Sequence, residues 1–179
     1  VEDLKSIKAR CMGDGGEILQ RMGMATVIIP GGELYEAMKR GTIDAFEYST
    51  LASNWNMHFN EVAEYVYLSP VRAPCDPQVF FVNKDAWNEL PKDLQLLVQT
   101  FVDKYTQAQH EFLVYESILA LEKFKEAGNK VVKIPDEVNK ALAAEAAKFY
   151  EEKVASEPPI FGEIYNSMKK YGESYESMR

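Results

Sequence analysis

The sequence predicts an α/β protein with a parallel or mixed sheet, followed by one long helix and then by further C-terminal helices. Short β-type runs alternate with helical patterns in the first part of the chain, which is typical of β-α-β units with parallel strands. The β-type runs cover residues 7–11, 26–29 and 42–47. Helices are predicted over about 16–22 and 32–40, with Gly23 and Gly41 where each should end.

The middle of the chain continues with a helix predicted over 49–59 and two more β-type runs, over 64–69 and 78–83. Between those two runs, residues 70–77 contain three prolines. Proline restricts the backbone and removes a hydrogen-bond donor. This segment should therefore be a stiff, irregular crossing, suited to a hinge or to the edge of a cleft.

A seven-residue apolar repeat follows, in which an apolar side chain recurs every three or four positions from Leu94 to Leu119. This spacing predicts one helix that begins near Pro91, continues to Ala127 and ends at Gly128. About 36 residues at 1.5 Å each would span about 54 Å. Such a helix is longer than one small lobe, so we expect it to brace two bodies or to pair with a partner chain.

The C-terminal part is predicted to hold one strand and two helices. The strand covers 130–134, and the helices cover about 136–156 and 160–171, separated by Pro158 and Pro159. The tail over 172–179 is polar and is expected to fray unless a partner covers it.

Composition restricts the classes of function. The 179 residues suffice for one domain with a core or for two small lobes. The net charge of -8 argues against a nucleic-acid partner, because phosphate binding requires a basic face. A small anionic ligand needs only one local cation and stays compatible with this charge. No stretch approaches the roughly 18 apolar residues of a membrane span.

The cysteines and histidines offer little for catalysis or zinc binding. Cys11 and Cys75 are too few for a four-cysteine zinc site, and His58 and His110 are not at ligand spacing to them. The cysteines are either two buried thiols or a disulfide that closes a long loop, which would fit an oxidising compartment. The sequence also lacks the nucleophile and metalloprotease motifs of hydrolases, so an enzymatic role is disfavoured.

Arg10 is a candidate for binding a small anion. It ends the first β-type run, before the glycine-rich turn 13–16 and a helix. Ligands of open α/β sheets bind off the carboxyl ends of strands, and the planar fork of arginine matches a carboxylate at two points. Backbone N–H groups of the turn could assist, although the turn lacks the pattern of a phosphate loop. The alternative is a surface arginine or one in a structural salt bridge.

Glu47 and Tyr48 stand at the end of the third β-type run. A carboxylate buried at a strand end is costly unless it meets a cation or hydrogen-bond donors. Glu47 could therefore pair with Arg10, bind a metal or accept a hydrogen bond from a ligand hydroxyl; otherwise it is a solvated loop residue. Tyr48 belongs either to the core or to the aromatic wall of a small-ligand pocket.

Seven motifs, taken in order, resemble the extracytoplasmic solute-binding proteins of TRAP transporters (tripartite ATP-independent periplasmic transporters). Within that family, the resemblance is to the branch that binds 2-oxo acids and other small carboxylates. The motifs are Asp3–Lys5, Ile7–Arg10, Gly15–Glu17, Pro30–Tyr35, Ile43–Tyr48, Glu61–Tyr67 and Val82–Pro91. The resemblance is to the C-terminal portion of the family. A large N-terminal part of the parent protein is then expected to be missing, and the lack of a signal peptide says nothing about export.

The resemblance implies roles for individual residues. Arg10 would form the salt bridge to the substrate carboxylate, and Glu47 with the main chain of Tyr48 would help to hold a metal ion. A further metal ligand of the family falls at Ala73, and alanine cannot coordinate a metal. The expected ligand-binding residues are thus Arg10, Cys11, Glu47, Tyr48 and Ala73. No cofactor is expected to be required, although a sodium or calcium ion could bind at the ligand site.

The resemblance also implies an architecture and a mechanism. The lobes would be those of a periplasmic binding protein, closing around a small organic carboxylate and delivering it to the membrane subunits in the periplasm. Some members of this branch dimerise through C-terminal helices. The alternative is a helix-mediated interaction or dimerisation module without a small ligand. The expected parts are an α/β ligand-binding lobe over 1–70, a hinge crossing with a strand of the other lobe over 71–90, a long bracing helix over 91–128, and a C-terminal strand and helices over 129–179.

Overall fold

The computed structural model describes residues 1–71 and 79–178. Its N-terminal part holds a sheet of three parallel strands, β1 (Lys8–Arg10), β2 (Ala25–Val27) and β3 (Ala45–Phe46). The strand order is β2-β1-β3, so β1 is the central strand. The predicted α/β fold with parallel strands is confirmed.

Helices connect the three strands in the predicted order. α1 (Gly13–Arg21) lies between β1 and β2, and α2 (Leu34–Lys39) lies between β2 and β3. Leu34 at the start of α2 is fully buried against Ile43 and Phe59, which anchors this helix to the sheet. Short 3-10 helices complete this region; they are η1 (Glu2–Ser6), η2 (Gly31–Glu33) and η3 (Phe59–Glu61).

A second, separate sheet pairs β4 (Tyr65–Leu68) with β5 (Lys130–Lys133), also in parallel. The side chain of Asn129 fixes the chain at the start of β5. Its Nδ2 donates hydrogen bonds to the backbone carbonyls of Asn60 and Ala63, at 2.9 and 2.7 Å. The two strands are far apart in sequence because the long helix lies between them.

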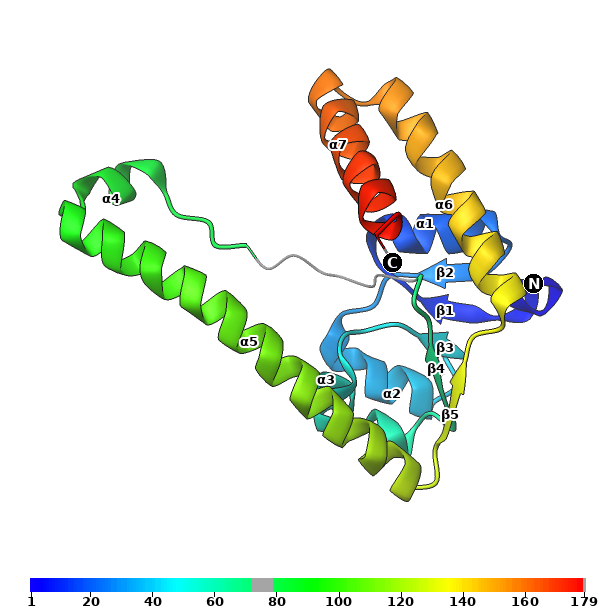
Figure 1. Cartoon of the computed structure of the whole chain (residues 1–179). Helices are drawn as coiled ribbons and strands as arrows, with labels where there is room; N and C mark the ends of the chain where they lie inside the picture. Colours follow the sequence, from blue (N-terminus) through cyan, green and yellow to red (C-terminus); the bar gives the residue numbers. More distant parts are fainter. Residues whose placement is uncertain (72–78, 179) are drawn as a thin grey trace.

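That long helix is α5 (Lys92–Glu126), and its 35 residues span about 52 Å. Gly128 follows with φ of 92°, a conformation that glycine adopts at little cost, so the predicted end is confirmed. The C-terminal end of α5 packs on α3 (Leu51–Asn56), where the rings of Trp55 and Phe124 lie edge to face at 5.3 Å. Figure 1 shows the rest of α5 running away from both sheets.

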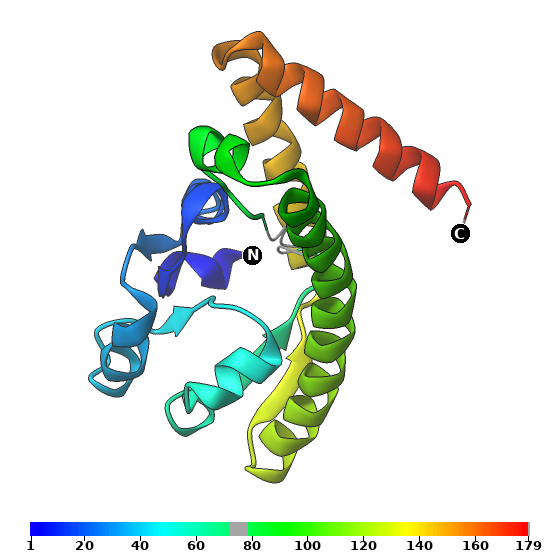
Figure 2. The ribbon, with the colours of Figure 1, turned by 90° about the vertical axis from the view of Figure 1, so that its left-hand side faces the viewer.

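Two helices form the C-terminal part. α6 (Asp136–Ser156) packs against α1, and α7 (Pro159–Glu176) packs against α6. Figure 2 shows α7 leaving the end of α6 and extending away from the sheets. The predicted fraying of 172–179 is wrong for most of that tail, because α7 continues to Glu176. The rings of Tyr171 and Tyr175 stack at 6.3 Å, and side-chain contacts one turn apart favour the helix.

The strand predicted over 78–83 is also corrected. Residues 79–83, the described part of this run, form no strand. A strand needs a neighbour to accept its hydrogen bonds, and the strands of the two described sheets pair only with one another. The side chain of Phe81 is 92% exposed as a result. The predicted crossing is described only at 70–71, and Ala73 and Cys75 fall outside the described residues.

α4 (Lys84–Glu89) is absent from the predicted elements, although the sequence carries its start signal. Oδ1 of Asn83 accepts hydrogen bonds from the N–H groups of Asp85 and Ala86, at 2.9 and 3.1 Å. Asparagine is among the preferred residues at this capping position. The helix has only six residues, too few to produce a periodic apolar pattern.

Candidate functional site

Arg10 is the last residue of the central strand β1, and the backbone on both sides holds it in place. The carbonyl of Arg10 accepts a hydrogen bond from the N–H of Glu47 at 3.1 Å. The N–H of Cys11 donates to the carbonyl of Val27 at 3.2 Å. The chain therefore leaves the sheet at a fixed point, at the carboxyl edge where parallel sheets bind ligands. Only 4% of Arg10 is exposed.

The guanidinium of Arg10 is held by neutral acceptors. Its Nε donates to the carbonyl of Ile29 at 3.0 Å, and Nη1 donates to the carbonyl of Glu47 at 2.6 Å. Nη2 lies 2.7 Å from the sulfur of Met12. Among the described residues, none of the ion pairs involves Arg10. The structure thus contains a buried cation that forms no ion pair with a described carboxylate.

Such a cation suits an incoming anion. A buried charge is costly unless it is paired, and carbonyl dipoles compensate it only in part. These contacts engage three of the five N–H donors of the guanidinium. The thioether of Met12 is a weak acceptor, so a carboxylate oxygen could replace it at Nη2 and form a stronger, charge-assisted hydrogen bond.

Glu47 and Tyr48 lie beside Arg10, as their positions after β3 predicted. Oε1 of Glu47 accepts a hydrogen bond from the N–H of Met12 at 3.3 Å. The ring of Tyr48 lies 6.0 Å from the guanidinium carbon of Arg10, and 41% of Tyr48 is exposed. Gly31 permits this position of the ring, because a Cβ there would be 2.6 Å from Cε2 of Tyr48. Arg10 contacts the backbone carbonyl of Glu47, at 2.6 Å, and forms no ion pair with its carboxylate among the described contacts.

The remaining predicted ligand residues are Cys11 and Ala73. Cys11 is 4% exposed and belongs to the core cluster with Ala9 and Met24. Ala73 lies outside the described residues. Met12 and Ile29 both contact the guanidinium, but no motif of the sequence marks either of them. The contact of Met12 with Arg10 could have been anticipated, because the two residues are only two positions apart. No local signal marks Ile29.

The described residues offer an incomplete set of metal ligands. No group of three or more His, Cys, Asp or Glu side chains within 1–71 and 79–178 is arranged to hold a metal ion. Calcium takes about six to eight oxygen ligands. The carboxylate of Glu47 could therefore hold a calcium ion only together with several oxygen donors from a ligand or from other parts of the protein. Glu47 and the main chain of Tyr48 fit such a site only as part of a larger set.

The two histidines do not lie at the strand ends that carry Arg10 and Glu47. His110 is exposed on α5. His58 lines a shallow hollow of about 290 Å³, together with Tyr35, Met57 and Glu61. The hydroxyl of Tyr35 donates to Glu61 at 2.7 Å, and this hydrogen bond raises the pKa of Tyr35.

Across the part of the chain that is described, no helix is both long and apolar enough to cross a membrane.

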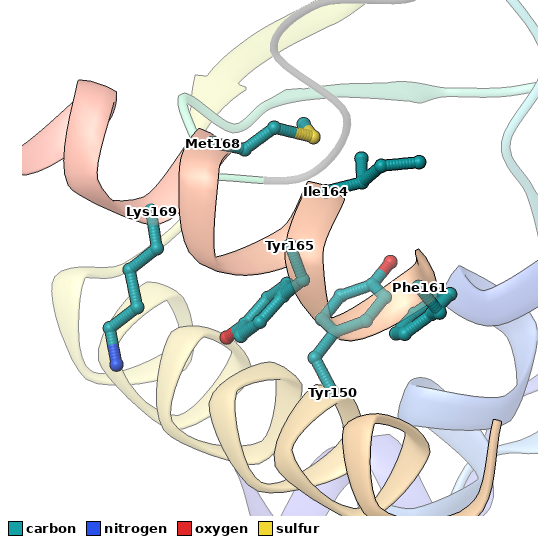
Figure 3. A pocket seen from close by; sticks show the side chains of 6 residues that line it. All are labelled: Tyr150, Phe161, Ile164, Tyr165, Met168 and Lys169. Carbon is teal, nitrogen blue, oxygen red and sulfur yellow. The ribbon is translucent and has the colours of Figure 1, made fainter. Parts of the chain in front are cut away.

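A larger hollow of about 500 Å³ lies between α6 and α7, remote in the fold from the Arg10 contacts. Figure 3 shows its six lining side chains, of which Tyr150 comes from α6 and the others from α7. The rings of Tyr150 and Tyr165 stack at 5.6 Å. We regard the carboxyl edge of β1 as the candidate ligand site despite this larger hollow, because a buried cation is present there.

Comparisons with known proteins identify the family of the chain. Residues 1–157 match the DctP family, described as bacterial extracellular solute-binding protein, family 7. The chain is 31% identical over 174 residues to a monocarboxylate 2-oxoacid-binding periplasmic protein of Nostoc sp.. That match covers 96% of this chain and 47% of the relative.

Solved structures show the same fold. A TRAP periplasmic solute-binding protein from Colwellia psychrerythraea, with bound calcium and pyruvate, is 28% identical, with a TM-score of 0.84 over 99% of this chain and 54% of that one. One from Bordetella bronchiseptica is 29% identical, with a TM-score of 0.83 over 99% of this chain and 52% of that one. The latter is a mixed-occupancy dimer with copurified calcium and picolinate in one active site and an apo second site.

The chain spans about half the length of the curated relative that it matches, and it corresponds to the C-terminal half of its homologues. The family match covers most of its residues, and the resemblance in the sequence is confirmed. This protein chain therefore belongs to the DctP family of bacterial extracellular solute-binding proteins, the solute-binding components of TRAP transporters.

Proposed function

We propose that this chain is part of a periplasmic protein that captures a small monocarboxylate of the 2-oxo acid type and delivers it to TRAP membrane subunits. The observation that carries this proposal is the buried guanidinium of Arg10, held by two carbonyls and a thioether. A carboxylate would supply the balancing charge at the carboxyl edge of β1. The pyruvate bound to the Colwellia relative and the 2-oxoacid specificity named for the Nostoc relative support the same ligand class.

The rest of a protein of the relatives' length is proposed to form the second wall of the site. The exposed apolar side chains on the first half of α5 and before α4 need a cover that the described residues do not supply. Leu96, Leu97, Phe101, Phe80 and Phe81 are all at least half exposed. If a second lobe covers these side chains, α5 braces the two lobes, and we propose the crossing before α4 as the hinge.

A thermal-shift panel tests the capture of a carboxylate. The full-length protein is heated with pyruvate, other 2-oxo acids, hydroxy acids and dicarboxylates, each with calcium, with sodium or with a chelator. A ligand at about 100 times its Kd adds about 2.7 kcal/mol to the free energy of unfolding, so we expect several degrees for 2-oxo acids. A shift that requires a cation would support a metal ion at the ligand site, with Glu47 and Tyr48 as its candidate ligands. No shift with any carboxylate would contradict the proposal.

A second proposal is dimerisation through the C-terminal helices, and the exposed apolar side of α7 is the observation that favours it. Ile164, Met168 and Tyr171 are 54%, 68% and 72% exposed, and the first two line the hollow of Figure 3. We propose that this face joins two copies of the chain. The proposal is compatible with ligand capture, since α7 lies away from Arg10, and the Bordetella relative is a dimer.

Replacing Met168 with glutamate is expected to convert this dimer into a monomer. A charge buried in an apolar interface loses its hydration without a partner, which costs several kcal/mol and exceeds what one contact contributes. Sedimentation velocity over a hundredfold range of concentration measures the change. Lys170→Glu, on the same helix, is the control and should remain dimeric. A wild-type protein that is monomeric throughout would contradict the proposed interface.

A further inference from the structure

An ion pair joins the first turn of α1 to α6, two parts of the chain that are 139 residues apart. Nζ of Lys153 lies 2.7 Å from Oδ1 of Asp14. Both side chains are partly sheltered, at 28% and 38% exposure. The hydrogen bond to Asp14 raises the pKa of Lys153, so the lysine stays charged at neutral pH. Figure 1 shows α6 beside α1, the helix on which it packs.

Asp14 stands close to the candidate ligand site along the chain. It follows Met12 by two residues, and the sulfur of Met12 touches the guanidinium of Arg10. The N–H of Met12 donates to the carboxylate of Glu47 at 3.3 Å. The turn that carries Asp14 is therefore directly attached to the groups that would surround a bound carboxylate.

A negative charge at this turn works against the binding of an anion. The first turn of a helix attracts anions through its unpaired N–H groups and its dipole, and a side-chain carboxylate in that turn competes for the same potential. An unpaired Asp14 would also repel a bound carboxylate directly. The sequence thus places an unfavourable charge two residues after Met12, and α6 supplies its partner.

Given the carboxylate capture proposed above, we propose that Lys153 is a positioning residue of the anion site, which neutralises Asp14 so that the first turn of α1 stays favourable to the ligand. Lys153 acts through Asp14 and has no need to touch the ligand. The binding lobe of the protein then includes α6, which contributes one charge to the site from a distance.

The same interface offers a matched control at its other end. Arg21, the last residue of α1, donates from Nη1 to Oε2 of Glu152 at 2.8 Å. Phe149, which is 1% exposed, lies between the two pairs, with Arg21 and Lys153 at 4.8 and 5.0 Å from its ring centroid. Arg21→Met and Lys153→Met each remove one ion pair between α1 and α6 and one cation–π contact with Phe149. Arg21→Met also removes a longer pair with Glu17, at 3.5 Å within α1.

Isothermal titration of the full-length protein with pyruvate tests this role in a double-mutant cycle. Lys153→Met should weaken binding about fivefold to tenfold, as expected for one unscreened charge near the ligand. Asp14→Asn should bind as tightly as wild type or more tightly, and Asp14→Asn with Lys153→Met should restore the wild-type Kd within about twofold. Arg21→Met should lower Tm by a similar amount to Lys153→Met without changing Kd.

A merely structural ion pair gives a different pattern. In that case Asp14→Asn and Lys153→Met would weaken binding equally, and the double variant would not recover, which overturns the role of Lys153. Equal Kd values for all four variants would overturn it as well and leave carboxylate capture intact. A wild-type protein that binds no carboxylate in the thermal-shift panel would overturn the proposed function, and the role of Lys153 with it.

Discussion

Replacing Arg10 with methionine is expected to reduce the affinity for the carboxylate ligand at least a hundredfold while the protein still folds. Methionine keeps much of the length of the side chain but removes the charge and all N–H donors. A charge-assisted hydrogen bond contributes about 1.5–3 kcal/mol, and a bidentate pair involves two of them. Isothermal titration with pyruvate measures the loss, and circular dichroism with Tm measures folding.

The stability of the Arg10→Met protein without ligand follows from the same contacts. The carbonyls of Ile29 and Glu47 lose a donor, at a cost of about 1–3 kcal/mol each if no water replaces it. The variant also removes a buried cation that lacks a described carboxylate partner, which offsets part of that cost. We therefore expect a modest change in Tm, far smaller than the loss of binding.

Two controls separate the fork of Arg10 from its charge. Arg10→Lys keeps a positive charge but loses the planar set of donors, so its affinity should lie between wild type and Arg10→Met. The methyl ester of pyruvate lacks the charged carboxylate and should bind the wild-type protein as poorly as pyruvate binds Arg10→Met. Unchanged affinity of Arg10→Met for pyruvate would rule out Arg10 as the anchor.

Replacing Phe124 with alanine is expected to destabilise the protein by about 3–5 kcal/mol, the typical cost of removing a buried phenylalanine. Phe124 is 2% exposed, near the C-terminal end of α5, and packs edge to face on Trp55 of α3. Among the described residues, those that cover α5 lie around Phe124. Removing the Phe124 ring should therefore release α5 from the lobe that carries Arg10. Urea unfolding followed by circular dichroism measures the free energy of unfolding.

The control for this prediction is Phe124→Leu, which retains most of the buried volume and should cost clearly less than the alanine variant. Far-ultraviolet circular dichroism of Phe124→Ala should still show the helices, since the variant removes packing and not helical propensity. If Phe124→Ala unfolds within about 1 kcal/mol of wild type, α5 is held elsewhere, and its contact with α3 does not anchor the brace.

The elements that could be predicted from the sequence are those with local signals. Apolar side chains at seven-residue spacing and a glycine at the end sufficed for α5, because helix periodicity and helix stops depend on neighbouring residues. The strand 78–83 could not be excluded in the same way. Its residues have the β-type composition, but a strand forms only with a partner, and no described strand is available to residues 79–83.

The sequence by itself determined that Arg10 ends the first strand of a β-α-β unit, ahead of a helix start, and that Glu47 and Tyr48 stand where another strand of that sheet ends. Parallel strands bring their carboxyl ends to one edge, so these residues meet there. The tertiary structure decided the rest, because it depends on residues distant in the chain. It surrounds the guanidinium with the carbonyls of Ile29 and Glu47 in place of a described carboxylate, and it brings Lys153 to Asp14. Sequence patterns report periodicity and caps within a few residues, whereas the balance of buried charge depends on which elements pack together.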